Sequence, residues 1–147
     1  MTVVLSLCHH PLFRQLAELK LDTRDYVVFG SAPMFAHNLT GKLHDLDVVA
    51  RGEALRYAET YGVPGTGEVT GDRLWKLCGG HIEVSARWVS PEWDTDDLIS
   101  RAELIDGVPF APLADVLEYK LMLRRAKDTE DIRTLYRRAG TATPPTD

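Results

Sequence analysis

Short β-prone runs that alternate with helix-length segments fill the first part of this chain, and they constrain its fold more than any other feature. The run Tyr26-Val27-Val28-Phe29 stops at Gly30, and a second run occupies residues 44–50. Apolar residues at helical spacing precede the first run at 9–21, and residues 51–61 are helical by composition. This alternation predicts an α/β or α+β domain, in which helices flank a central mixed β-sheet.

The second half of the chain adds further strands and then a pair of helices. We expect strands at 72–77 and 81–88, joined by a Gly79-Gly80 turn, and another strand at 104–108. We expect the C-terminal helices at about 112–126 and 128–139.

The length of 147 residues suits one domain with one hydrophobic core. We therefore expect residues 1–147 to form a single domain, with the main sheet within about 24–90 and the C-terminal helical part within about 92–140.

Charge and cysteine content predict the setting in which the protein works. The chain has 17 Lys and Arg residues against 22 Asp and Glu residues, which argues against a dedicated binder of duplex nucleic acid. Cys8 and Cys78 form no CxxC pair, as is typical of a reducing compartment. No stretch approaches the roughly 20 apolar residues that a membrane span requires. We expect a cytoplasmic protein that does not enter a membrane.

Two aspartates stand on one face of the predicted second strand. Strand alternation places Asp45 and Asp47 together, opposite Leu46 and Val48, with their Cα atoms about 7 Å apart. Two like charges at that distance repel by about 2 kcal/mol at an effective dielectric constant of 20. A divalent cation would remove this repulsion, whereas on an ordinary amphipathic strand both side chains would simply face solvent.

A third carboxylate follows the same logic. Glu83 shares a strand face with His81, Ser85 and Arg87, while the residues between them are apolar. If this strand and the strand of Asp45 and Asp47 turn their apolar faces to the same helices, all three carboxylates emerge on one side. Hard oxygen donors of this kind suit Mg²⁺ or Mn²⁺.

Gly30 and Ser31 close a strand and open a helix that we expect to reach about Leu39. Backbone N–H groups at such a junction can hold a phosphate, and glycine permits close approach. The alternative is an ordinary turn in which Ser31 caps the helix.

Lys120 falls within the apolar stripe of the first C-terminal helix, and Arg124 follows one turn later. An inward ammonium group needs a partner, because burying it alone is costly. Lys120 can extend to the helix edge, pair with a carboxylate or meet a triphosphate. Asp128 is placed to orient Arg124 if the helix continues.

Together these segments resemble the signature of the polymerase-beta-like nucleotidyltransferase superfamily. The carrying features are Gly30-Ser31 after a strand, thirteen intervening residues, Asp45-Leu46-Asp47-Val48, and later Ile82-Glu83-Val84. The region containing Lys120, Arg124 and Lys127-Asp128 looks like the helix pair of small bacterial members, which include abortive-infection toxins and minimal nucleotidyltransferase antitoxins.

The resemblance implies the nucleotidyltransferase fold and a site for Mg²⁺ or Mn²⁺ at Asp45, Asp47 and Glu83. It also implies that Gly30, Ser31, Lys120 and Arg124 contact a nucleoside triphosphate (NTP), with Asp128 in support. The expected activity is transfer of a nucleoside monophosphate to a hydroxyl acceptor, which is a small molecule, an RNA end or a protein side chain. Because the predicted sheet and helix pair take up most of the chain, we expect either a small acceptor or an acceptor site completed by a homodimer or a partner protein.

Two other functions stay open at this point. One is a catalytically silent nucleotide-binding or antitoxin-like module on the same fold, which would bind a partner protein. The other is a metal-dependent nuclease, which is disfavoured because Glu83 is not followed by the E-x-K pattern.

Overall fold

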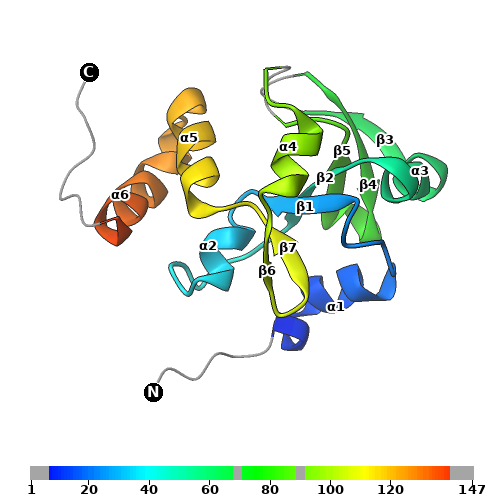
Figure 1. Cartoon of the computed structure of the whole chain (residues 1–147), viewed down its shortest axis with the longest axis horizontal. Coiled ribbons are helices and arrows are strands. Elements are labelled where there is room, and N and C mark those ends of the chain that lie inside the picture. Colours follow the sequence, from blue (N-terminus) through cyan, green and yellow to red (C-terminus); the bar gives the residue numbers. More distant parts are fainter. Residues whose placement is uncertain (1–6, 68–70, 89–91, 140–147) are drawn as a thin grey trace.

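The protein is an α+β structure built on a seven-stranded mixed sheet (Figure 1). The computed structural model describes residues 7–67, 71–88 and 92–139, and these contain six α-helices. The strands are β1 (Tyr26–Phe29), β2 (Leu46–Ala50), β3 (Val63–Thr66), β4 (Arg73–Leu77), β5 (Ile82–Ser85), β6 (Glu103–Ile105) and β7 (Val108–Phe110). The helices are α1 (Pro11–Glu18), α2 (Ala32–Ala36), α3 (Gly52–Tyr61), α4 (Thr95–Ser100), α5 (Leu113–Leu123) and α6 (Thr129–Arg138). Short 3-10 turns, η1 (Leu7–His9), η2 (Cys78–Gly80) and η3 (Ala126–Asp128), complete the elements.

The strand order is β3-β4-β5-β2-β1-β7-β6. β2 runs antiparallel to β1 and parallel to β5, and β1 runs parallel to β7. The pairs β3–β4, β4–β5 and β6–β7 are antiparallel. The sheet is therefore mixed, as the sequence predicts, and β1 and β2 lie near its middle.

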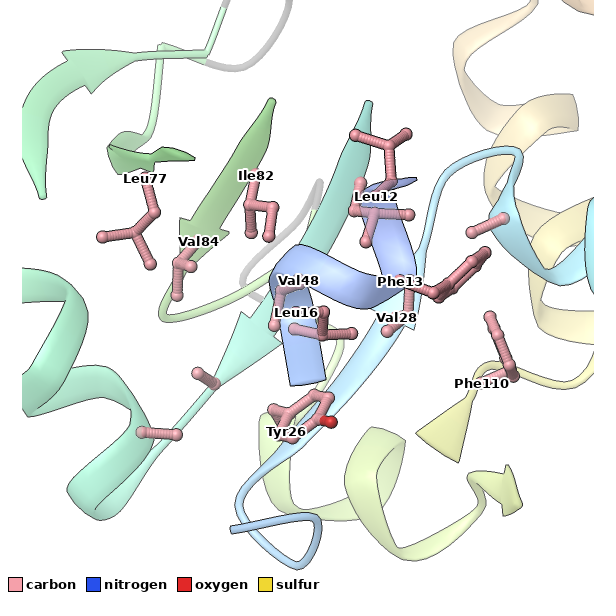
Figure 2. Close-up of a cluster of buried hydrophobic side chains, with 14 of the residues drawn as sticks. Leu12, Phe13, Leu16, Tyr26, Val28, Val48, Leu77, Ile82, Val84 and Phe110 are labelled. Atoms are coloured by element: carbon pink, nitrogen blue, oxygen red, sulfur yellow. The ribbon is translucent and has the colours of Figure 1, made fainter. Parts of the chain in front are cut away.

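One hydrophobic cluster covers the sheet face formed by Val28, Val48, Ile82 and Val84 (Figure 2). Residues of α1, α2 and α3 pack on it. This confirms that β2 and β5 turn their apolar sides to the same helices. The alternate residues of β2 and β5 therefore point to the other face of the sheet.

A second cluster lies on that other face. Val27, Phe29 and Val49 pack there against side chains from α4, α5 and α6. All four residues of β1 are consequently buried, because helices cover the strand from both sides. The same face carries Asp47 and Glu83, so the helix pair lies beside the carboxylates.

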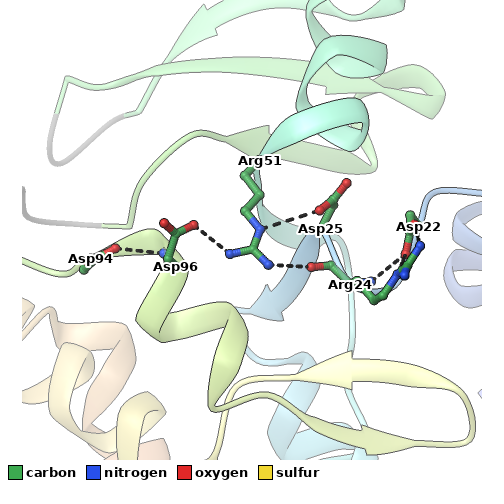
Figure 3. A network of polar contacts seen from close by, with 6 residues as sticks. All are labelled: Asp22, Arg24, Asp25, Arg51, Asp94 and Asp96. Carbon is green, nitrogen blue, oxygen red and sulfur yellow. Dashed lines mark hydrogen bonds and ion pairs between the residues drawn. The ribbon is translucent and has the colours of Figure 1, made fainter.

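Arg51 joins three elements at the far end of β1 (Figure 3). Its guanidinium group donates to Asp96 Oδ1 at 2.6 Å and to the Arg24 carbonyl oxygen at 2.9 Å, and it lies 3.6 Å from Asp25 Oδ1. These contacts connect the entry to β1, the start of α3 and the first turn of α4.

Two predictions are wrong, the end of the helix after Gly30 and the single strand at 104–108. The helix after Gly30 ends at Ala36 rather than near Leu39, and the Ser31 side chain makes no capping hydrogen bond. The expected strand at 104–108 is instead a hairpin, because Asp106 and Gly107 both have positive φ. Asp-Gly is a typical two-residue hairpin turn, and the sequence contained this signal.

The segment between α3 and β4, residues 62–71, is rich in glycine. It contains β3, an edge strand with mostly exposed residues, while residues 68–70 lie outside the described part. The acidic segment after residue 92 contains α4, which sequence reasoning missed. Strands β6 and β7 extend the sheet beyond the expected limit of residue 90.

None of the helices in the described ranges is long and apolar enough to cross a membrane. Cys78 is a free thiol, and the side chain of Cys8 is outside the described residues.

We predict that Leu46→Ala lowers the free energy of unfolding by about 2–5 kcal/mol, because it leaves a cavity beneath the middle of the sheet. Leu46 is fully buried, whereas Leu104 on the edge strand β6 is 68% exposed. Leu104→Ala is therefore the matched control and should change stability little. Urea denaturation of both variants measures the difference, and equal losses would contradict this account of the core.

Candidate active site

A row of side chains crosses one face of the sheet at the level of Asp47. The β2–β1 register pairs Asp47 with Phe29, and the β2–β5 register pairs it with Glu83. The next strand continues the row, because Lys76 pairs with Glu83. Cross-strand neighbours stand on the same side of a sheet, so this register brings Asp47, Glu83 and Lys76 together.

Asp45 lies just before β2 and is exposed, whereas Asp47 is half-buried within it. Both line the same cleft as Glu83. The structure thus brings the three carboxylates to one cleft, with Asp45 outside the strand in which it was expected.

Gly30 lies directly against Asp47. A Cβ atom added at Gly30 would stand 2.5 Å from Asp47 Oδ2, and Gly30 has φ of +70°. Any side chain here would therefore meet the carboxylate and also strain the backbone. Glycine at position 30 is what allows the end of β1 to pass beside Asp47.

The environment of Asp47 opposes its ionisation. Burial, followed by the neighbouring charges of Asp45 and Glu83, raises the pKa of Asp47 from 3.8 to about 7. The charges of Lys127 and Arg125 act in the opposite direction on this pKa, which places both cations within electrostatic reach of Asp47. A carboxylate held in this way gains from a bound cation.

In the described part of the chain, no three His, Cys, Asp or Glu side chains are gathered closely enough to form a metal cage. The donor chemistry of Asp45, Asp47 and Glu83 nevertheless fits a hard divalent cation. All three offer carboxylate oxygens to one cleft, and the raised pKa of Asp47 reflects negative charge that such an ion would neutralise.

Helix α5 and the turn η3 form the opposite side of the cleft. Lys120 lies inward as predicted, with a side chain only 3% exposed. Its Nζ atom is 3.2 Å from Asp128 Oδ1 and 3.2 Å from Asp131 Oδ2. Of the three outcomes that the sequence left open for Lys120, pairing with carboxylates is the one observed, and the residue also lines the cleft.

Asp128 holds two cations. It accepts hydrogen bonds from Lys120 Nζ and, at 2.7 Å, from Arg125 Nε. Burial alone would raise the pKa of Asp128, but the hydrogen bond and charge of Arg125 and the charge of Lys120 outweigh it and keep the pKa below its ordinary value. Asp128 thus stays ionised and fixes both cations beside the cleft.

The cleft between these two sides has a volume of about 810 Å³. Seven of the eight residues predicted for the site line it, namely Gly30, Ser31, Asp45, Asp47, Glu83, Lys120 and Asp128. Segments far apart in the sequence therefore meet at one place.

Arg124 is the exception among the predicted residues. Helix α5 ends at Leu123 rather than near residue 126, and Arg124 follows it in the left-handed conformation with φ of 43°. The helical-wheel position predicted for Arg124 therefore does not apply. Asp128 orients Arg125 instead of Arg124, because the backbone leaves the helix through a left-handed Arg124 and an extended Arg125 before η3 begins.

Sequence reasoning did not single out several residues of the cleft as site residues. Arg125 directly precedes η3 and Lys127 lies in it, whereas Lys76 and Arg87 come from the side of the sheet. Lys76 was identifiable only from the pairing of β4 with β5. Trp88 lines the cleft while its ring stacks on Phe29 with centroids 4.8 Å apart, so it joins the second hydrophobic cluster to the site.

Comparison of this chain with protein-family models, curated proteins and solved structures gives no match. The candidate function is therefore argued from the cleft itself.

We predict that Gly30→Ala destabilises the fold more than Gly107→Ala. Both positions have positive φ, which costs about 1–2 kcal/mol for a residue with a Cβ atom. Only at position 30 would the added Cβ atom also contact Asp47, since nothing lies within 4 Å of a Cβ atom at position 107. Gly41→Ala, with neither feature, is the second control. Thermal unfolding should rank the losses Gly30, Gly107, Gly41, and equal losses at Gly30 and Gly107 would refute the close approach.

We predict that Asp47→Asn stabilises the metal-free protein at high pH. The folded state holds the Asp47 proton up to about pH 7, whereas an unfolded aspartate with a pKa of 3.8 releases it earlier. The contribution of Asp47 to the free energy of unfolding therefore falls as the pH rises from 3.8 to about 7. At pH 8 the free energy of unfolding of the variant should exceed that of the wild type by about a few kcal/mol. This difference should vanish near pH 4.

The measurement is denaturant unfolding in a chelator across this pH range. The control is Glu59→Gln, which removes an exposed carboxylate on α3. A stability difference for Asp47→Asn that does not change with pH would rule out the raised pKa.

Proposed function

We propose that this protein is a Mg²⁺-dependent nucleotidyltransferase, which transfers a nucleoside monophosphate from an NTP to a hydroxyl acceptor and releases pyrophosphate. The observation that carries the proposal is the pairing of Asp47 with Glu83 across β2 and β5, beside the glycine turn and opposite a set of cations. Carboxylates on one side of a cleft and cations on the other suit a metal-bound triphosphate.

Asp45, Asp47 and Glu83 would hold Mg²⁺ or Mn²⁺, which supplies charge neutralisation at the phosphates and a more acidic acceptor hydroxyl. The triphosphate would lie between the carboxylates and η3, where Arg125 and Lys127 face Asp47. Gly30 leaves room for a phosphate because it has no side chain, and the Ser31 hydroxyl, which makes no capping bond, can donate to a phosphate oxygen.

In the reaction, the acceptor oxygen attacks the α-phosphorus and forms a new P–O bond. The bond from the α-phosphorus to the oxygen that bridges to the β-phosphorus breaks, and pyrophosphate leaves with that electron pair. Glu83 would accept the hydroxyl proton, and Arg125 and Lys127 would compensate the charge of the departing pyrophosphate. Lys120 would support these cations from beneath, through the aspartate it shares with Arg125.

A catalytically silent nucleotide-binding module is the second candidate, and the state of Lys120 favours it. Asp128 and Asp131 already neutralise this lysine, so its charge is partly satisfied without a triphosphate. Such a module would bind NTP, as calorimetry can measure, and would show no turnover.

We predict that wild-type protein transfers label from an α-labelled NTP to an acceptor in the presence of Mg²⁺, and that chelation abolishes the transfer. Asp47→Asn should lower the rate by about 100-fold or more, because a metal contributes several kcal/mol to such a transition state. Glu59→Gln, on the surface of α3, should keep the wild-type rate. Equal labelling by wild type and Asp47→Asn would overturn the proposal, whereas NTP binding without transfer would favour the silent module.

A further inference from the structure

Tyr119 on α5 combines a buried ring with a hydroxyl group that makes no hydrogen bond to the described residues. The residue is only 2% exposed, and it lines the cleft. A buried tyrosine hydroxyl usually has a hydrogen-bond partner. Within residues 7–67, 71–88 and 92–139, the Tyr119 hydroxyl has none. A ligand in the cleft would supply the partner that the protein itself does not.

The charged side chains around Tyr119 show where its hydroxyl lies. Burial raises the pKa of Tyr119, the negative charges of Asp47 and Asp128 raise it further, and the positive charge of Arg125 lowers it. All three charged residues line the same cleft. The hydroxyl is therefore within electrostatic reach of Asp47 on one side of the cleft and of Arg125 on the other. It stays protonated at any physiological pH, so it is available as a hydrogen-bond donor.

Two aromatic side chains hold the Tyr119 ring in place. The ring stands edge-on to Phe29, with centroids 6.0 Å apart, and edge-on to Trp88, with centroids 5.1 Å apart. Phe29 is the cross-strand neighbour of Asp47, so the ring is anchored beside the strand that carries this carboxylate. A donor fixed in this way is preorganised, because binding a ligand does not have to order the side chain first.

The position of the hydroxyl selects the kind of atom that can accept its hydrogen bond. An oxygen that enters the cleft here lies near the Arg125 cation as well as the Tyr119 donor. This combination favours an anionic oxygen over the neutral hydroxyl group of a sugar, because hydrogen bonds to a charged acceptor are the stronger ones. In the proposed reaction, the triphosphate occupies the space between Asp47 and Arg125.

We infer that the Tyr119 hydroxyl donates a hydrogen bond to a triphosphate oxygen of the bound NTP. The inference rests on the proposed function and adds to it a substrate-binding residue that the sequence motifs did not indicate. Because the ring is fixed, this bond helps to set the position of the triphosphate relative to the carboxylates of β2 and β5.

The test is Tyr119→Phe, which removes one oxygen atom and keeps the ring against Phe29 and Trp88. Calorimetry measures binding of tripolyphosphate, which has neither sugar nor base, and of the α,β-methylene analogues of ATP, GTP, CTP and UTP, all with Mg²⁺. The affinity for tripolyphosphate, and for each analogue that the wild type binds, should fall about ten-fold or more. The free energy of unfolding without ligand should not fall, since the free protein loses no hydrogen bond.

Tyr26→Phe is the matched control. Tyr26 is 4% exposed and packs in the first hydrophobic cluster, on the opposite face of the sheet (Figure 2). Within the described ranges its hydroxyl also has no hydrogen-bond partner, but it does not line the cleft, and burial alone raises its pKa to about 12. The same chemical change at this position should leave every affinity at the wild-type value.

The outcomes separate the inference from the proposed function. If Tyr119→Phe binds all probes as the wild type does, or if Tyr26→Phe weakens binding equally, the inference fails while label transfer by the wild type still supports the proposed function. A loss of affinity for the NTP analogues but not for tripolyphosphate would place the hydroxyl at the nucleoside and overturn the inference. A fall in unfolding free energy for Tyr119→Phe would show a structural partner and also overturn it.

Two further outcomes bear on the proposed function. If Tyr119→Phe weakens binding of both kinds of probe but the wild type transfers no label, the inference holds for the silent module and the proposed function fails. If the wild type binds none of the probes, the proposed function fails and the inference fails with it.

Discussion

Repulsion between carboxylates at the middle of the sheet is the constraint on which the candidate site depends. Asp47 sits between Phe29 on one side and Glu83 on the other, so it cannot move away from Glu83 without breaking the register of β2. Burial and the charges of Asp45 and Glu83 both disfavour its ionised form. The protein keeps this arrangement because the apolar sides of β2 and β5 are locked into the core.

The buried carboxylate of Asp128 positions two of the cations that lie across the cleft from Asp47. Asp128 is almost fully buried and binds both Lys120 and Arg125, so the end of α5, η3 and the start of α6 form one charged unit. Removing one member of such a buried set leaves the others without partners, which costs more than the set contributes. Lys120 and Arg125 are therefore held beside the cleft by Asp128, whereas Lys76 on β4 is exposed.

Local patterns were sufficient for the parts of this fold that are governed by short-range physics. The alternation in Asp45-Leu46-Asp47 predicted which side chains share a face, and the stripe around Lys120 predicted that it turns inward. What failed was the geometry at helix ends: Arg124 was placed by extending a helix that stops one residue earlier. Asp128 therefore pairs with Arg125, whereas Arg124 was its predicted partner. The same alternation placed Arg87 on the face of Glu83, and the Gly79-Gly80 turn predicted that the strands of Lys76 and Glu83 are neighbours. The register that sets Lys76 opposite Glu83 was not predicted, because it depends on the exact geometry of that turn.

In the proposed function, the distance of each cation from Asp47 decides which phosphates it can contact. A triphosphate needs cations on one side of a metal site only, and η3 already provides them beside Asp47. Lys76 stands beyond Glu83 with one strand, β5, between it and Asp47, so two strand spacings of about 4.8 Å separate the Cα atoms of Lys76 and Asp47 along the row. If the triphosphate lies beside Gly30 as proposed, Lys76 is on the side of Glu83 that the acceptor approaches.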